Sequence, residues 1–259
     1  MSRVEARVDL HVHSRYSTKD SLTLVYQLEE ARQERGLSHL AITDHNTLGE
    51  APKTLRKLSG FPFILGEEIL TTAVNPNGKN IEIVGIFLKE AIPAVPCPTL
   101  EDTIYGIGAQ GGMVIIPHPF EGWRHGAGEE MSLFIVDECR RQKIPVACEV
   151  FNARARSPRY NLRARNFWQE RLAPMGVLAT AGSDAHRKAE VGNAYVSMKP
   201  WATLEEFREN LGEGIIHGNS RQAGWHRTLN RIEILLGRPL EDFRESLRRG
   251  LLPDSSDRE

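Results

Sequence analysis

Hydrophobic residues along the chain fall into short runs that alternate with amphipathic segments, which is typical of β/α units. The runs predict strands at 8–12, 39–43, 61–69, 81–88, 113–116, 145–151, 177–181, 194–198 and 214–217. The amphipathic segments predict helices at 22–35, 49–58, 100–110, 129–142, 161–172, 204–210 and 229–249, before a polar tail. Regular alternation of strands and helices indicates a parallel sheet of the α/β class.

Histidines gather where these strands end. In a barrel built from such units, catalytic side chains lie at the carboxyl ends of the strands. Of the nine histidines, five lie at or just past the end of a predicted strand: His11, His13, His45, His118 and His186. Side chains alternate between the two faces of a strand, so His11 and His13 point the same way. Two imidazoles on one face can bind one metal ion.

Carboxylates occupy the same strand ends. Glu67 and Glu68 are adjacent, so they face opposite sides and at most one of them points at the site. Asp184 and His186 are two residues apart and share a face. Each motif alone has an ordinary explanation, such as a helix cap at Asp44. Together they exceed the four ligands of one tetrahedral zinc ion, and they suit Zn²⁺, Mn²⁺ or Fe²⁺. The set therefore predicts two or three divalent metal ions.

Composition and charge narrow the class of protein. The 259 residues carry a formal net charge of −1, so no overall basic field attracts a nucleic-acid backbone. The three cysteines match no zinc or redox motif and are expected to be reduced thiols. The first residues lack the apolar core of a signal peptide, and no apolar run approaches the ~20 residues of a membrane helix. We expect a cytoplasmic protein without membrane contact, and the oligomeric state stays open.

The motifs and their order together resemble the PHP (polymerase and histidinol phosphatase) superfamily. The matching stretches are DLHVHS (9–14), ITDHNT (42–47), GEEI (66–69), IPHP (116–119) and GSDAH (182–186). The resemblance implies a distorted, TIM-like (β/α)7 barrel whose active site lies at the carboxyl ends of the strands. We expect this barrel over residues 1–220 and a helical extension with a polar tail, packed on the barrel, over 221–259.

The resemblance also implies ligand roles for particular residues. The metal ligands that it implies are His11, His13, His45, His118, Asp184 and His186. The family pattern of Gly, any residue, Glu selects Glu68 over Glu67 as the bridging carboxylate.

Three positions depart from the family pattern. Asp20 lies seven residues past His13, where relatives place a ligand five or six past it, so Asp20 either reaches the metals or caps the following helix. Glu82 stands where many members have histidine, and it either ligates through oxygen or leaves one site incomplete. Glu149 ends a strand and is expected to support a ligand or face the substrate, with direct ligation the lesser alternative.

The reaction implied is hydrolysis of a small phosphomonoester or phosphodiester by a metal-activated hydroxide. The water bound to a metal ion has a pKa lowered toward ~7. Arginines follow several motif strands, and guanidinium binds phosphate bidentately. They are Arg15, Arg124, Arg154, Arg156 and Arg187. We choose Arg154 and Arg15 as the phosphate-binding pair. Asp184 or His186 could also carry the leaving-group proton, although ligation is favoured for both.

The expected substrate is a nucleotide, a sugar phosphate or a short oligonucleotide end. One alternative is an amidohydrolase acting on a C–N bond, which the lack of a lysine at a mid-barrel strand end disfavours. Another is a non-catalytic metal-binding module, which the Glu82 exchange supports. Three aromatic residues near the site, Phe120, Trp123 and Phe151, either stack on a base or serve as packing.

Overall fold

The computed structural model describes residues 5–17, 20–49, 63–94, 96–220 and 223–236. The helix predicted at 49–58 lies outside these residues except for Gly49. The first two residues of the strand predicted at 61–69 and the part of the predicted C-terminal helix beyond residue 236 also lie outside them. No helix among the described residues is long and apolar enough to cross a membrane.

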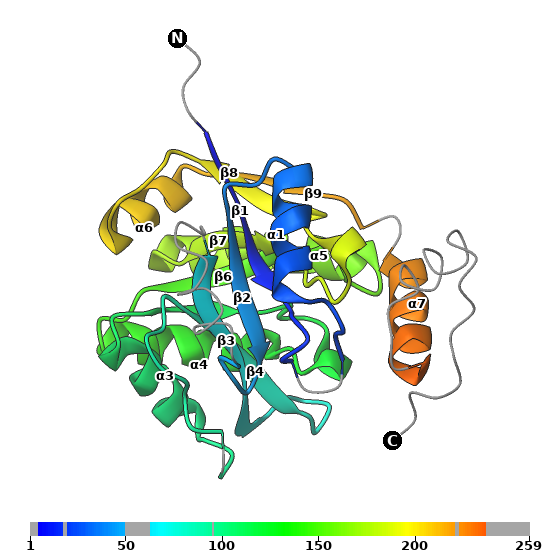
Figure 1. The fold of residues 1–259 in the computed structure, drawn as a ribbon. Coiled ribbons are helices and arrows are strands. Elements are labelled where there is room, and N and C mark those ends of the chain that lie inside the picture. The colour runs from blue at the N-terminus through cyan, green and yellow to red at the C-terminus, as the bar shows by residue number, and fades with distance from the viewer. Residues whose placement is uncertain (1–4, 18–19, 50–62, 95, 221–222, 237–259) are drawn as a thin grey trace, which may run out of the picture.

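A single nine-stranded sheet forms the centre of the molecule, in the order β7-β6-β5-β4-β3-β2-β1-β8-β9 (Figure 1). The strands are β1 (Ala6–Val12), β2 (His39–His45), β3 (Phe63–Val74), β4 (Asn80–Ile86), β5 (Met113–Ile116), β6 (Val146–Asn152), β7 (Leu178–Gly182), β8 (Ala194–Met198) and β9 (Ile215–Gly218). All the strands predicted from the sequence are present, with shifts of one or two residues at their ends, except that β3 runs five residues past the predicted end at Ile69.

The sheet closes almost completely into a barrel. Directly after β7, Asp184 N donates to His11 O at 2.7 Å, and His13 N donates to Ala185 O at 2.8 Å. Val12 and Ala185 form a parallel bridge, so the end of β7 returns to the end of β1. The predicted distorted barrel is confirmed. It differs from a (β/α)7 barrel in its strand count, because β8 and β9 extend the sheet beyond β1.

The sheet is mixed, whereas the alternation of strands and helices indicated a parallel sheet. β4 runs antiparallel to both β3 and β5, and β8 runs antiparallel to β1 and β9. β3 and β4 are joined by a tight turn in which the Asn75 carboxamide oxygen accepts from Asn77 N at 2.9 Å and Lys79 N at 3.2 Å. A parallel partner needs a long crossover, which this turn cannot provide. The amino end of β4 therefore lies where the neighbouring strands end.

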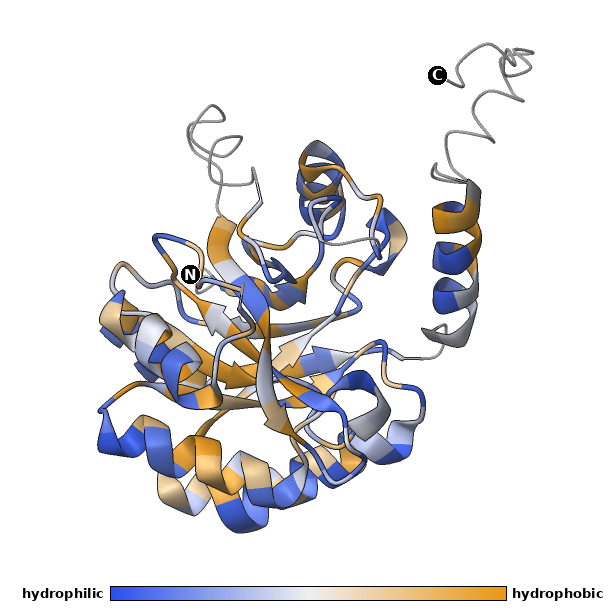
Figure 2. Cartoon of the chain, turned by 90° about the horizontal axis from the view of Figure 1, so that it is seen from below, coloured by the Kyte–Doolittle hydropathy of each residue, from blue (hydrophilic) through white to orange (hydrophobic). Residues whose placement is uncertain are grey.

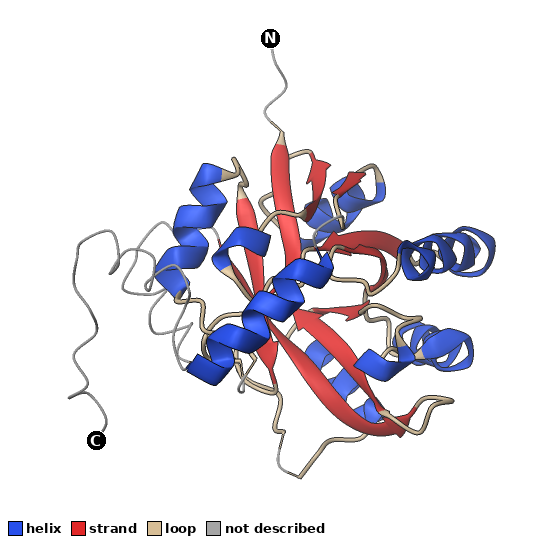
Figure 3. Cartoon of the chain, turned by 90° about the vertical axis from the view of Figure 1, so that its right-hand side faces the viewer, coloured by secondary structure: helices blue, strands red, loops and turns tan. Residues whose placement is uncertain are grey.

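In the described part of the chain, six α-helices lie around the barrel (Figures 1 and 2). They are α1 (Val25–Glu34), α3 (Leu100–Ala109), α4 (Gly128–Arg141), α5 (Pro158–Phe167), α6 (Leu204–Gly212) and α7 (Ala223–Leu236). α5 begins earlier than predicted because Ser157 caps it, its hydroxyl accepting from Arg159 N, and Pro158 fits the first helical position. α7 stands to one side of the barrel in Figure 1, and this side faces the viewer in Figure 3.

Alternation along β4 shows how the core and the site share a strand. Ile81 and Ile83 pack in the cluster beneath α3 and α4, whereas Val84 and Ile86 belong to the cluster inside the barrel. Glu82 shares the inner face with Val84 and Ile86 because side chains two residues apart point the same way. The strand thus fills the barrel with apolar residues and presents one carboxylate at its amino end.

The cysteines give a prediction that tests the packing. Cys97 is exposed, whereas Cys139 and Cys148 are buried, and burial raises the pKa of Cys139 to about 12. Thiols react as thiolates, so we expect one thiol of the three to react with an aromatic disulfide reagent in the native protein and all three after denaturation. If native protein released two or three equivalents of the aromatic thiolate per chain at one rate, this packing would be contradicted.

Candidate metal centre

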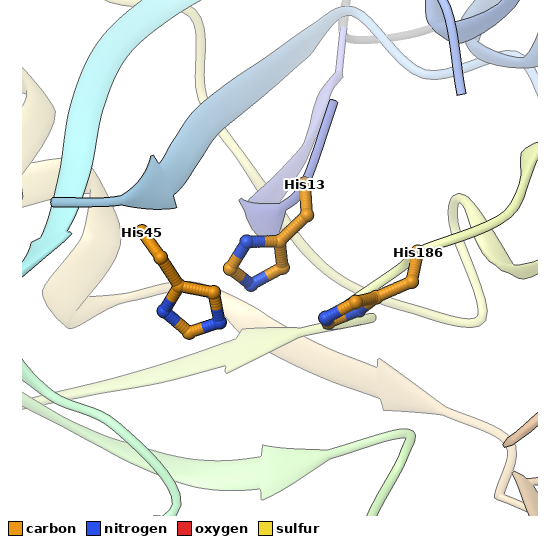
Figure 4. Close-up of side chains that lie close together, drawn as sticks. All are labelled: His13, His45 and His186. Carbon is orange, nitrogen blue, oxygen red and sulfur yellow. The ribbon is translucent and has the colours of Figure 1, made fainter. Parts of the chain in front are cut away.

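His11 and His13 lie at the end of β1 and point into the barrel mouth. Their Nε2 atoms are 3.1 Å apart, and both side chains are buried. His13 also lies beside the rings of His45 and His186, with ring centroids 4.6 and 4.3 Å away (Figure 4). Segments that are far apart in the sequence therefore bring their imidazoles together, as the strand-end motifs predict.

The Glu68 carboxylate lies among four of these imidazoles. Its Oε2 atom is 3.2 Å from His11 Nε2, 3.3 Å from His13 Nε2 and 3.3 Å from His45 Nδ1. Its Oε1 atom is 3.0 Å from His118 Nε2. No other described carboxylate is recorded against so many histidines within 3.3 Å.

Glu67 faces the other side of β3. Its Oε2 atom accepts a hydrogen bond from Ile92 N at 2.9 Å, and burial raises its pKa to about 7. The structure thus separates the two adjacent carboxylates by the alternation of the strand, and it places Glu68 in the cluster.

Asp20 belongs to the cluster and does not cap a helix. The N-cap of α1 is Leu24, four residues later. Asp20 Oδ2 lies 2.9 Å from His45 Nε2 and 3.1 Å from His186 Nε2. Of the two alternatives open from the sequence, capping of the helix does not apply, and Asp20 lies against two of the candidate ligands.

Asp184 and Glu82 complete the ring of carboxylates. Asp184 Oδ1 is 3.5 Å from His13 Nε2, and its other oxygen accepts from Asn152 Nδ2 at 2.9 Å and contacts the Arg124 guanidinium. Glu82 Oε1 is 3.5 Å from His45 Nδ1. Burial and the charge of Glu68 raise the pKa of Glu82 to about 8.

Glu149 holds the histidines in place from outside the cluster. Its Oε1 atom is 3.1 Å from His11 Nδ1, and its Oε2 atom accepts from His118 N at 2.8 Å and from Asn152 Nδ2 at 3.0 Å. When His11 donates through Nδ1, the lone pair of its Nε2 is free to face the cluster, which is how carboxylates orient metal-binding histidines. His186 is oriented likewise, with Nδ1 2.9 Å from the carbonyl oxygen of Asp184.

The donor atoms fit divalent cations. Four overlapping sets of three ligand atoms lie within 4.8 Å of one another. The sets are His13, His45 and His186; His11, Glu68 and His118; His11, His13 and Asp184; and His45, Glu68 and Glu82. Among the described residues, the buried Oδ1 atoms of Asp20 and Asp184 have no hydrogen-bond partner. Such unsatisfied atoms are costly unless they coordinate an ion.

The electrostatics lead to the same conclusion. Burial and the neighbouring His186 and His45 rings lower the pKa of His13 to about 3, so this imidazole is neutral at pH 7. Burial opposes the charged form of His45, yet Glu68, Asp20 and Glu82 raise its pKa to about 10. Neutral and charged imidazoles are thus crowded against several buried carboxylates. Divalent cations would compensate the carboxylates directly and leave every imidazole as a neutral ligand.

Two ligand candidates adopt unusual backbone conformations. His118, between two prolines, has φ 28°, and Asp184 has φ 53°. Non-glycine residues rarely adopt positive φ, and such strain of ~1–3 kcal/mol is typical of functional sites. The chain holds these two side chains in place at a cost in backbone energy.

A cavity of about 380 Å³ opens onto the cluster. Its lining includes the ligand candidates Asp20, His45, Glu68, Glu82, His118 and His186, and also Trp123, Arg124, Arg154, Arg156, Arg227, Asn230 and Arg231. The lining is therefore divided between metal-ligand candidates and arginines.

The structure sorts the predicted arginines. Arg154, Arg124 and Arg156 line the cavity. Arg15 is exposed and is not among the lining residues, and Arg187 is bound instead to Glu233 through contacts of 2.6 and 2.8 Å. The sequence pairing of Arg154 with Arg15 is thus not reproduced in space.

Some cavity residues were not found from the sequence. Arg227, Asn230 and Arg231 lie on α7, well past the last recognisable motif. Their only sequence signal is a spacing of three and four residues, which places them on one side of a helix. Of the aromatic candidates, Trp123 is 64% exposed at the cavity, whereas Phe120 and Phe151 pack against the core clusters.

Comparisons with known proteins identify the family. The PHP domain profile matches residues 9–84, and the PHP-associated profile matches residues 158–215. Two uncharacterized proteins of Methanocaldococcus jannaschii are 34% and 35% identical to the chain, over 57% and 73% of its length and 82% and 69% of theirs. The chain belongs to the PHP family.

Solved structures show the same fold at low identity. One is a two-domain protein of Bacteroides vulgatus that contains a predicted PHP-like metal-dependent phosphoesterase, with TM-score 0.59 and 17% identity over 83% of this chain and 65% of that one. Another is a lesion-specific endonuclease of Pyrococcus furiosus, with TM-score 0.58 and 18% identity over 82% of this chain and 58% of that one.

Proposed function

We propose that the protein is a metal-dependent phosphoesterase that hydrolyses a small phosphomonoester or phosphodiester, such as a nucleotide, a sugar phosphate or a short oligonucleotide end. The observation that carries the proposal is the Glu68 carboxylate, which lies among four imidazoles at the floor of a cavity lined by arginines. A metal cluster facing guanidinium groups suits an anionic phosphoryl substrate.

The proposed ligands hold two or three ions of manganese, iron or zinc. They are His11, His13, Asp20, His45, Glu68, Glu82, His118, Asp184 and His186. When bound, such ions supply an activated nucleophile and neutralise charge on the phosphoryl oxygens. The set combines imidazoles and carboxylates without any cysteine, which suits these borderline-to-hard cations.

Arg154 and Arg124 are the proposed phosphate-binding arginines. Arg154 is buried, and its Nε forms an ion pair with Glu190 Oε1 at 3.2 Å. Arg124 contacts Asp184 and lies 3.4 Å from Glu121 Oε2. Buried or paired guanidinium groups are preorganised for bidentate contact with a phosphate. Arg124 takes the place that the sequence analysis assigned to Arg15.

His186 serves as a ligand in this proposal, and a proton carrier is needed elsewhere. Because its Nδ1 donates to the Asp184 carbonyl oxygen, its Nε2 keeps a lone pair directed at Asp20 and the cluster. Asp184 is likewise held by Asn152 and Arg124. These contacts support ligation over proton transfer for both residues.

The test is phosphate release by protein that has been stripped with a chelator and reloaded with Mn²⁺, Fe²⁺ or Zn²⁺. We expect hydrolysis of p-nitrophenyl phosphate or its bis-ester that is abolished by the chelator and restored by metal. Nucleotides, sugar phosphates and histidinol phosphate then narrow the substrate. Tight metal binding without release from any ester, together with cleavage of amide substrates, would instead establish the amidohydrolase alternative.

A further inference from the structure

The helix α7 forms a wall of the cavity, although it lies outside both family matches. Those matches end at residue 215, and α7 covers Ala223–Leu236. Arg227, Asn230, Arg231 and Ile234 all line the cavity. Their spacing of three and four residues directs one side of the helix toward the metal cluster.

Asn230 and Glu233 tie this helix to the cluster and the segment that follows it. Asn230 Nδ2 donates to the backbone oxygen of Asp20 at 2.7 Å. Arg187, which follows His186 in the chain, forms a double contact of 2.6 and 2.8 Å with Glu233, and both side chains are buried. A buried double ion pair fixes geometry, so α7 has a defined position over the site.

A third contact joins α7 to the phosphate-binding side. Arg227 Nη1 donates to the backbone oxygen of Arg154 at 2.6 Å. One guanidinium nitrogen thus anchors the side chain to the barrel, while the group as a whole lines the cavity. Guanidinium has five donors in a fork, so this anchor leaves further donors for a ligand.

Positive charge accumulates in the lining of the cavity. Five arginines line it, and carboxylates pair with Arg124 and Arg154. Within the described part of the chain, no carboxylate is recorded within 4.0 Å of the Arg156, Arg227 or Arg231 guanidinium groups. Burial, and then repulsion from Arg124 and Arg154, lowers the pKa of Arg227. Crowded like charges are unfavourable, and an anion bound between them would relieve the repulsion.

We propose that Arg227 and Arg231 bind a second anionic group of the substrate, a phosphate or carboxylate separate from the phosphoryl group cleaved at the metal cluster. This rests on the proposed function and adds the substrate class to it. Arg124 pairs with Asp184, and Arg154 pairs with Glu190, which also accepts a hydrogen bond from His186 N at 3.0 Å. Both arginines are thus tied to metal-ligand candidates, and they serve the scissile group. A cavity of about 380 Å³ accommodates a small bis-anion.

The two α7 arginines thereby act as specificity residues. A substrate with one anionic group leaves them unmatched, whereas a substrate with two separate groups engages both sides of the cavity. A hydrogen bond to a charged group contributes ~1.5–3 kcal/mol, so we expect a preference for bis-anions of about tenfold or more.

Calorimetric titration of metal-loaded protein tests the proposal with matched ligands. Fructose 6-phosphate is compared with fructose 1,6-bisphosphate, and glycerol 3-phosphate with 3-phosphoglycerate, which adds a carboxylate. The wild type should bind at least one bis-anion about tenfold or more tightly than its mono-anionic partner. The pair that shows the preference identifies the second group as a phosphate or a carboxylate.

Variants then assign the preference to α7. The double variant Arg227→Gln and Arg231→Gln should lower the ratio of the two dissociation constants toward one. Arg231→Gln alone should lower this ratio in part. The Arg231 side chain is exposed, and a thermal melt checks that the variant is folded. Arg208→Gln, at an exposed position of α6 away from this cavity, should keep the wild-type ratio.

Two results would overturn the proposal: equal affinities for mono-anions and bis-anions in the wild type, or a preference that survives in the double variant. Failure of the proposed function is a separate result. If the protein binds bis-anions through α7 but releases no phosphate from any ester, the proposed anion site stands and the proposed phosphoesterase activity is contradicted.

Discussion

Replacing Glu68 by glutamine is expected to abolish tight metal binding and phosphate release together. The substitution keeps the size of the side chain but removes the charge that lies within 3.3 Å of four imidazoles. Loss of a residue that merely orients a ligand costs ~10–100-fold in metal affinity, so loss of a central ligand should cost more than about 100-fold. Metal content after gel filtration and a metal titration measure the effect.

The control is the next residue in the chain. Glu67→Gln removes the same charge from the opposite face of β3, where the carboxylate accepts from Ile92 N. We expect its metal content to match the wild type. Full metal content in Glu68→Gln, or an equal loss in Glu67→Gln, would contradict the placement of the centre.

Replacing Gly182 by alanine is expected to weaken metal binding by displacing His11, which packs against this glycine. A Cβ atom at this position would lie 2.3 Å from His11 Cβ and 2.7 Å from Glu149 Oε1. The seam between β1 and β7 must then open, and His11 must shift with it. Overpacking of this kind costs ~1–3 kcal/mol, which lowers Tm by several degrees in a protein of this size. Metal affinity should fall about tenfold or more, because the orienting contact from Glu149 to His11 is disturbed.

The matched control is Gly212→Ala at the end of α6. A Cβ atom there meets only Leu178 Cδ2, at an ordinary distance of 3.5 Å. Alanine is favoured over glycine in a helix by ~0.5–1 kcal/mol, so Tm should stay the same or rise slightly, with metal binding intact. Wild-type stability and metal affinity in Gly182→Ala would show that the seam tolerates a methyl group and that His11 is not held as tightly as the structure indicates.

Local alternation determined much of the site in advance. His11 and His13 share a face, and Glu67 and Glu68 do not, because a strand repeats every two residues whatever its partners are. The positions of the strands followed from runs of apolar residues for the same reason. The sequence therefore predicted which side chains gather at strand ends, and the family resemblance added their order around the barrel.

Strand direction and long-range approach were decided by the tertiary structure. Glu82 reaches the cluster because a tight hairpin reverses β4, and the alternation of apolar residues is identical for a parallel and an antiparallel strand. Asp20 reaches it because α1 begins only at Val25, which leaves the preceding segment free to approach His45 and His186.

The arginines show the same division most clearly. Their proximity to motif strands in the sequence did not determine their direction: Arg154 lines the cavity, Arg15 is exposed and Arg187 is bound to Glu233. Arg227 and Arg231 come from a helix that no motif connects to the site. The sequence by itself determined the ligand types and the strand faces, which depend on local geometry. Only the tertiary structure decided which cations surround the substrate cavity, because that depends on how distant segments pack.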